Sequence, residues 1–198
     1  GAGCGSPPPA EPIKVEPIRP ATEAPQEPSS EPMNETSAST STEERLAFPG
    51  VLPGERIEGK IVRITTDVGE IVFEILPEEG PKAASNFVYL AEKGFYDGLV
   101  FHRVESWVIQ GGDPLGKGIG GPGYRFEDDP VRLPYVKGIV AMANSGPNTN
   151  GSQFFIMKEQ VPLPPSYSIF GRVLSGLDVV DKVAIGTKML SVTVEDKE

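Results

Sequence analysis

The chain has 198 residues, with 21 prolines, 23 glycines, one cysteine, one histidine and a formal net charge of −10. One cysteine cannot form an internal disulfide. One histidine cannot build a multi-histidine metal site, and it leaves a single imidazole for any triad-type catalyst. With 18 basic against 28 acidic residues, the chain lacks the positive balance of a general nucleic-acid binder.

Residues 1–48 differ in composition from the rest of the chain. They hold nine prolines, eight glutamates, three basic residues and one aromatic residue, Phe48. No apolar periodicity runs through 6–42, so this stretch cannot bury enough surface to offset the entropy lost on ordering. We therefore expect a disordered tether over 1–48 and one globular domain over 49–198, which is long enough for a sizeable core.

The opening residues, GAGCGS, resemble the end of a bacterial lipobox, in which the cysteine carries a lipid. Cys4 is the only cysteine and stands at the head of the tether. We therefore expect lipidation at Cys4 and an extracytoplasmic, membrane-anchored protein. The alternative is a chance cysteine in a non-native opening, and a cytoplasmic location is then expected. No apolar run reaches the 18 residues that would predict a membrane-spanning helix.

The domain opens with two alternating, β-branched runs, 60–66 and 70–76, around a short turn at 67–69. This pattern predicts a β-hairpin. The next segment, 82–93, follows Pro81 and has apolar residues at i, i+3, i+4 and i+7 before Gly94. That spacing predicts a helix with a glycine at its C-terminal end.

The remaining elements are mostly short. Apolar runs predict strands at 99–104, 107–110, 138–144, 153–157, 168–173 and 189–194, and spaced apolar residues from 177 to 183 indicate a second short helix. Many short strands, two helices and no βαβ alternation favour a mainly β fold, a closed or nearly closed antiparallel barrel.

The glycine-rich loop at 111–123 imitates two nucleotide-binding motifs. Residues 118–123 satisfy G-x-G-x-x-G, and 111–117 match a phosphate-binding loop except for its final Ser or Thr. Both motifs need a helix directly after the loop. Two prolines and seven glycines make such a helix untenable here, so we do not expect nucleotide binding.

Other candidate chemical groups have simpler explanations. His102 lies on a strand with no nucleophile motif nearby, so we expect a structural histidine with hydrogen bonds near the barrel wall. The acidic clusters 78–79 and 127–129 lack the ligand spacing of a calcium loop, so we expect them in solvated turns. We predict no metal and no cofactor.

A polar and aromatic group of residues is more informative. Arg103 is followed by Trp107 and Gln110, and a turn-rich loop at 145–151 leads to Gln153 and two phenylalanines. A guanidinium, amides and aromatic rings without an acid, base or nucleophile suit recognition of an apolar group next to a peptide carbonyl. Because side chains alternate along a strand, Phe154 and Phe155 should face opposite sides, one in the core and one in a pocket.

These segments together resemble the signature blocks of the cyclophilin family of peptidyl-prolyl cis-trans isomerases. The matching blocks are FHRV at 101–104, QGGDP at 110–114, GIGGPGY at 118–124, MANSGPNTNGSQFF at 142–155 and FGRV at 170–173. The similarity runs from about 59 to 194. It implies a closed eight-stranded antiparallel barrel capped by two helices, an isomerase without a cofactor, and proline-containing polypeptide clients.

The resemblance also implies roles for individual residues. Arg103 corresponds to the catalytic arginine, with Gln110 and Gln153 as polar residues near it, and Asn144 should bind substrate through its backbone. Substrate-binding positions on the rim and the neighbouring loop are Ala143, Ser145 and Gly118. The apolar proline pocket is expected from Trp107, Val108, Phe155, Leu163 and Tyr167.

Some positions depart from the family pattern. Segment 161–167 lacks the tryptophan that many members use to hold cyclosporin, Tyr167 stands where histidine is common, and 103–110 is one residue shorter than in well-known eukaryotic members. We therefore expect a bacterial-type, monomeric enzyme without tight cyclosporin binding. Two alternatives remain: a client-binding chaperone with little turnover, and an interaction protein whose tether is the functional part.

Overall fold

The structure, a computed structural model, describes residues 45–198. Cys4, its predicted lipid and nearly all of the predicted tether lie outside the described residues. The elements, in order, are α1 (Gly54–Ile57), β1 (Lys60–Thr66), β2 (Gly69–Ile75), α2 (Pro81–Glu92), β3 (Arg103–Val104), β4 (Val108–Gly111), β5 (Ile139–Met142), β6 (Phe154–Met157), β7 (Ile169–Ser175), α3 (Leu177–Lys182) and β8 (Met189–Asp196).

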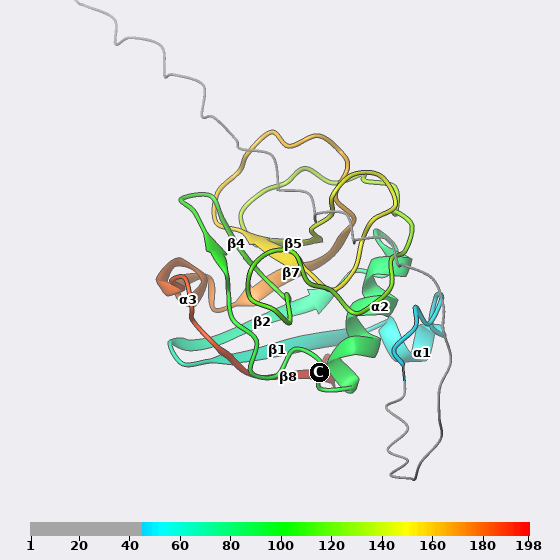
Figure 1. The fold of residues 1–198 in the computed structure, drawn as a ribbon, viewed down its shortest axis with the longest axis horizontal. Helices are drawn as coiled ribbons and strands as arrows, with labels where there is room; N and C mark the ends of the chain where they lie inside the picture. The colour runs from blue at the N-terminus through cyan, green and yellow to red at the C-terminus, as the bar shows by residue number, and fades with distance from the viewer. Residues whose placement is uncertain (1–44) are drawn as a thin grey trace, which may run out of the picture.

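All eight strands belong to one antiparallel sheet with the order β3-β4-β6-β5-β7-β2-β1-β8. The sheet curls into a half-barrel, with α2 and α3 on opposite sides of it and the long loops gathered beyond β4 and β5 (Figure 1). The expectation of a mainly β, eight-stranded antiparallel fold with few helices is confirmed. The one-turn helix α1 was not predicted, because four residues are too short to show a helical period.

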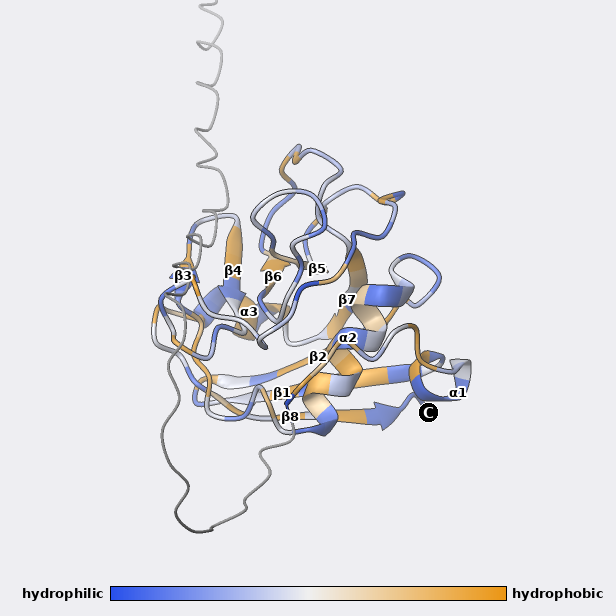
Figure 2. Cartoon of the chain, turned by 45° about the vertical axis from the view of Figure 1, so that its right-hand side comes forward, coloured by the Kyte–Doolittle hydropathy of each residue, from blue (hydrophilic) through white to orange (hydrophobic). Residues whose placement is uncertain are grey.

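The two faces of the sheet carry two separate apolar clusters. The larger one packs α2 against the sheet and contains Phe154, whereas the smaller one contains Phe155. Both rings are fully buried. The predicted alternation of the two phenylalanines is therefore confirmed, and Figure 2 shows the hydrophobic colour concentrated on the strands and α2.

Helix α2 buries the stripe that its sequence period predicted. Ala84, Phe87, Val88 and Ala91 are at most 5% exposed, and the Phe87 ring centroid lies 4.6 Å from that of Tyr96 and 5.2 Å from that of Phe154. Such aromatic pairs add to the energy of burial. This packing fixes the sheet on which the loops of the candidate site are mounted.

The chain enters the domain before the predicted boundary at residue 49. Leu46 and Phe48 pack against the larger cluster, and the ring of Phe48 stacks on that of Phe126 with centroids 4.8 Å apart. In residues 45–198, no helix is long and apolar enough to cross a membrane.

Candidate active site

A cavity of about 750 Å³ lies between the glycine-rich loop and the loop that leads into β6. Six of the predicted site residues line it: Gln110, Gly118, Ala143, Asn144, Ser145 and Gln153. Gln110 lies on β4, and the others lie in the two loops. The structure therefore brings together residues that are up to 43 positions apart in the sequence.

A chain of hydrogen bonds joins Arg103 to this cavity. Arg103 on β3 lies directly opposite Gln110 on β4, and its Nη1 donates to Gln110 Oε1 at 3.3 Å. Gln110 Nε2 donates to Gln153 Oε1 at 3.0 Å, and Gln153 Nε2 donates to the carbonyl of Gly120 at 2.9 Å. Each amide thus has its orientation set by the next group along the chain.

The other side of Arg103 meets two neighbours from its own hairpin. Its Nε donates to Glu105 Oε1 at 2.6 Å, and its Cζ lies 5.4 Å from the centroid of the Trp107 ring. The Arg103 side chain remains 20% exposed. Sequence reasoning missed Glu105, because an acidic residue at a hairpin turn is ordinarily solvated and nothing in its spacing indicates an ion pair.

The predicted proline-pocket residues lie in one apolar cluster, next to the cavity rather than along its lining. Trp107, Val108 and Phe155 are at most 2% exposed, and Leu163 and Tyr167 pack against them while remaining partly exposed. Tyr167 meets the Phe155 ring edge-on, with centroids 5.6 Å apart. The structure thus places these five residues together.

The glycine-rich loop is wrapped around one buried carboxylate. Asp113, 1% exposed, accepts hydrogen bonds from four backbone N–H groups, those of Leu115, Lys117, Gly118 and Ile119. Burial acts to raise the pKa of Asp113, but these backbone hydrogen bonds outweigh it and lower the pKa below its usual value. Sequence reasoning singled out Gly118 and missed Asp113.

Two glycines of this loop are needed for steric reasons. Gly118 has φ of +81°, a backbone conformation that residues with a Cβ rarely adopt. A Cβ on Gly120 would lie 2.0 Å from Asp113 Oδ1. The glycines therefore let the backbone close around Asp113, and the resemblance of this loop to a nucleotide-binding motif is coincidental.

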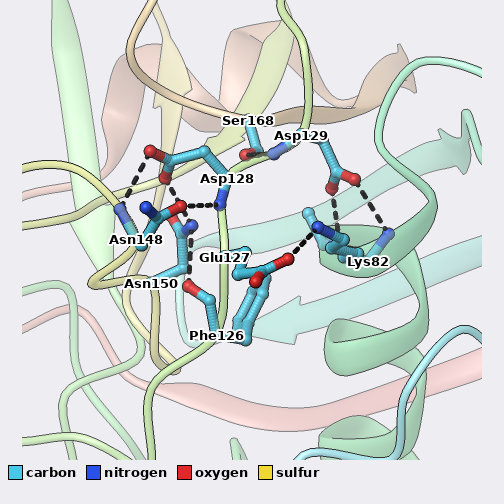
Figure 3. Close-up of polar contacts among 9 residues, drawn as sticks. Lys82, Phe126, Glu127, Asp128, Asp129, Asn148, Asn150 and Ser168 are labelled. Atoms are coloured by element: carbon cyan, nitrogen blue, oxygen red, sulfur yellow. Dashed lines mark hydrogen bonds and ion pairs between the residues drawn. The ribbon is translucent and has the colours of Figure 1, made fainter.

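The loop on the other side of the cavity is tied to residues 126–128 (Figure 3). Asn148 N–H donates to Asp128 Oδ2 at 2.9 Å, and the Asp128 N–H donates to Asn148 Oδ1 at 3.0 Å. Asn150 Nδ2 donates to Asp128 Oδ1 at 2.7 Å. Asn148 has φ of +59°, a conformation that asparagine tolerates better than most residues.

The expectation that cluster 127–129 lies in a solvated turn is wrong for Asp129, which is buried, whereas Asp128 is half-buried. Asp128 holds the loop just described. Asp129 is 4% exposed and accepts from the N–H groups of Lys82 and Ala83, at 3.2 and 2.9 Å, and so caps α2 (Figure 3). Glu127 remains largely exposed and pairs with Lys82.

His102 also differs from expectation. Both of its ring nitrogens are buried, and neither has a hydrogen-bond partner among residues 45–198, whereas a hydrogen-bonded histidine was predicted. Burial lowers the pKa of His102 below its usual value, and Arg103 acts in the same direction, while Asp113 and the neighbouring Gln153 side chain oppose it. His102 is therefore a packed, neutral ring at neutral pH. Within the same described residues, no group of three or more His, Cys, Asp or Glu side chains could hold a metal ion.

Comparisons with known proteins identify the family of this chain. The family model described as cyclophilin type peptidyl-prolyl cis-trans isomerase/CLD matches residues 61–197. The chain is 46% identical over 140 residues to peptidyl-prolyl cis-trans isomerase 9 of Schizosaccharomyces pombe, covering 67% of this chain but only 23% of that protein. It is 45% identical over 129 residues to the isomerase-like 3 protein of Gallus gallus, covering 62% of this chain and 80% of that protein.

Solved structures show the same fold. A Cryptosporidium parvum cyclophilin type isomerase matches with a TM-score of 0.64 and 34% identity, covering 69% of this chain and 97% of that one. The structure of that protein in the presence of the dipeptide Ala-Pro matches with a TM-score of 0.63 and 35% identity, covering 68% and 98%. With a family model matched over more than half of its length, the chain belongs to the cyclophilin-type peptidyl-prolyl cis-trans isomerase family.

Proposed function

We propose that this domain accelerates cis–trans rotation of X-Pro peptide bonds in polypeptide clients, with Arg103 as the catalytic group. The observation that supports this proposal most directly is the hydrogen-bond chain Arg103–Gln110–Gln153. It joins a partly exposed guanidinium to a cavity lined by amides. The family to which the chain belongs supports this reaction. The names of the matched relatives describe peptidyl-prolyl cis-trans isomerases or isomerase-like proteins.

The chemistry needs only a fixed cation. Rotation about the peptide bond crosses a barrier of about 18–20 kcal/mol, because amide conjugation is lost. In the twisted amide the proline nitrogen becomes pyramidal and gains a lone pair, and a guanidinium directed at it stabilises this state more than the planar one. One preorganised donor contributes about 2.7–4 kcal/mol in a site shielded from water. Arginine suits the role because it stays protonated at every accessible pH.

The substrate has two places to bind. We assign the proline ring to the cluster of Trp107, Val108, Phe155, Leu163 and Tyr167, entered from its partly exposed members. The residues before the proline are assigned to the cavity, beside Ala143, Asn144, Ser145 and Gly118. Asn144 Nδ2 donates to the carbonyl of Ser166 at 2.7 Å, which leaves the main chain of Asn144 as its group for substrate.

The test is the pair of variants Arg103→Ala and Arg103→Lys in a coupled peptide assay. We expect Arg103→Ala to lose about 100- to 1,000-fold in kcat/KM, as the loss of one preorganised donor predicts. Lysine restores the charge but not the planar guanidinium that bonds Gln110, so little activity should return. Arg132→Ala, which removes a surface arginine bonded to the carbonyl of Glu78, is the matched control. Near-normal turnover by Arg103→Ala would falsify the assignment.

The same variant separates isomerase from chaperone. If Arg103→Ala loses turnover while still suppressing client aggregation, binding and isomerisation are separable in this domain. The family comparisons favour the isomerase as the main activity. A monomer without nucleic-acid binding and without tight cyclosporin binding remains our expectation for its partners.

Two further proposals concern the ends of the sheet and of the chain. We propose that the half-barrel closes between the segments before β3 and before β8. Backbone hydrogen bonds of 2.7–2.9 Å between 98–101 and 186–189 support this, and slow hydrogen exchange of those amides is the test.

We also propose that Cys4 is lipidated and anchors an extracytoplasmic protein. Intact mass of the protein from its native source tests that proposal.

A further inference from the structure

We propose that Glu105 is a positioning residue for the reaction, fixing the side chains of Arg103 and Trp107 together with its two carboxylate oxygens. Glu105 Oε1 accepts from Arg103 Nε at 2.6 Å, and Glu105 Oε2 accepts from Trp107 Nε1 at 2.9 Å. One carboxylate therefore joins the catalytic cation to an aromatic wall of the apolar cluster. The inference rests on the function proposed above.

The backbone holds Glu105 in place for this role. It lies in the tight turn between β3 and β4, and its N–H donates to the carbonyl of Val108 at 2.9 Å. Arg103 and Trp107 lie two residues before and two residues after it. This backbone bond already fixes the turn. The main entropy cost of bonding both partners is therefore the loss of rotamer freedom in the Glu105 side chain itself.

The contacts restrict the guanidinium on three sides. Nε is held by Glu105, Nη1 by Gln110, and the Trp107 ring lies 5.4 Å from Cζ. Among residues 45–198, Nη2 makes no hydrogen bond, which leaves it as the group for the proline nitrogen. Charge-assisted bonds of this kind are directional as well as strong, so Glu105 sets where Nη2 points.

A carboxylate next to the cation has a second effect, opposite in sign. Its negative charge reduces the positive potential that the twisted amide would feel. The two effects predict opposite results when Glu105 is removed. Loss of positioning lowers the isomerisation rate, whereas loss of the negative charge, which weakens the potential of Arg103, raises it. We expect positioning to dominate, because misplacing a catalytic group by about 1 Å can cost about 100-fold, while the Glu105 side chain is 36% exposed and its field is screened by water.

The experiment compares Glu105→Ala and Glu105→Gln with Glu92→Ala in the whole chain. Glu92 is a matched control because it also pairs with an arginine, Arg56, but on the surface away from the cavity. We expect Glu105→Ala to lower kcat/KM about tenfold, mainly through kcat. Glu105→Gln keeps the size but can accept only through one oxygen, so its loss should be smaller.

Fluorescence provides a readout that is independent of turnover. Trp107 is the only tryptophan of the chain, so its emission reports on this site alone. We expect Glu105→Ala to shift the Trp107 emission and to increase its quenching by acrylamide, with the thermal midpoint unchanged. In a double-mutant cycle, Glu105→Ala and Trp107→Phe should not be additive in kcat/KM.

The outcomes separate this inference from the proposed function. If Arg103→Ala is inactive and Glu105→Ala keeps normal or higher kcat/KM, Glu105 has no positioning role and the inference fails while the function stands. If Arg103→Ala keeps its activity, the proposed function fails. A loss in Glu105→Ala that appears only as a lower thermal midpoint, without the fluorescence change, also overturns the inference.

Discussion

The two sides of the candidate site are built in different ways. The β3–β4 hairpin presents Arg103, and the contacts that orient its guanidinium come from the side chains of Glu105, Gln110 and Trp107. The two loops across the cavity are instead held by backbone hydrogen bonds to aspartates, Asp113 in one loop and Asp128 for the other.

Burial differs between the two sides as well. Glu105 is 36% exposed, whereas Asp113 is 1% exposed. A half-exposed ion pair contributes little to folding, but a buried carboxylate bonded to several N–H groups cannot be removed without leaving those groups unpaired. Changes on the hairpin side should therefore alter the rate, and changes on the loop side should alter stability or substrate affinity.

The largest effect on stability should come from Asp113→Ala. It leaves four backbone N–H groups without their acceptor, so we expect a loss of about 3 kcal/mol in the free energy of unfolding. Chemical denaturation measures this loss. Asp113→Asn, which keeps one oxygen acceptor, should lose less. An unfolding energy no lower for Asp113→Ala than for Arg103→Ala would remove the distinction between the two sides.

A smaller loss is expected for Gly120→Ala. The new Cβ would lie 2.0 Å from Asp113 Oδ1, so the loop must shift, at a cost of about 1–3 kcal/mol by analogy with overpacked sites. Gly121→Ala is the matched control for stability, because nothing lies within 4 Å of its Cβ position. Equal denaturation midpoints for the two variants would contradict the close packing described for Gly120.

Asp128→Ala should act on affinity more than on rate. It removes the two hydrogen bonds that the Asp128 carboxylate accepts from the loop at 144–150, and we expect KM to rise about fivefold while kcat changes little, given about 0.5–1.5 kcal/mol per net bond. Asn148→Gly loses only the bond from the Asp128 N–H to Asn148 Oδ1 and keeps the positive φ without strain, so its KM should rise less. A fall in kcat with unchanged KM would place this loop on the catalytic side.

The smallest effects are those of pH. The pKa of His102 is lowered and no acid or base takes part in the proposed mechanism, so the rate should be nearly flat between about pH 6 and 9. Below about 6.5 the unfolded chain binds a proton that the folded site disfavours, so stability should decline slightly as pH falls. A bell-shaped rate profile, or a stability decline retained in His102→Gln, would contradict this account.

Asp113 changes stability with the same sign as His102, but in a more acidic range. Because its folded pKa is depressed, its contribution to stability is complete above the unfolded value of about 3.9 and is lost only as pH falls through the lower folded value. The glycine-rich loop should therefore keep its structure down to about pH 4. Amide hydrogen exchange of Lys117 and Ile119 across this range would measure it.

The sequence predicted much of the fold, because most helices and strands can be recognised from the residue pattern of their own segment. The alternating runs at 60–66 and 70–76 became β1 and β2, and the period over 82–93 became α2. The run at 99–104 is ordered in a strand only at 103–104, because its earlier residues bond to the segment before β8, which local pattern cannot reveal.

The site shows where sequence reasoning ends. Arg103, Gln110, Gln153 and Phe155 were found through family motifs, and the structure places them together. Glu105, Asp113, Asp128 and Asp129 were missed or taken for solvated residues. Each is a carboxylate whose partners are backbone or side-chain donors brought near by the fold.

By itself, the sequence determined the composition of the domain, its strand and helix periods and the family motifs, because these depend on residue type and short-range spacing. Only the tertiary structure decided which carboxylates are buried, which loops they hold and how Arg103 is oriented. Those facts depend on contacts between distant segments: Asp128 reaches Asn148 across 20 positions and Asp129 reaches Ala83 across 46. Hydrogen bonds of this kind depend on the sheet bringing the segments together. The residue pattern of either segment alone therefore cannot predict them.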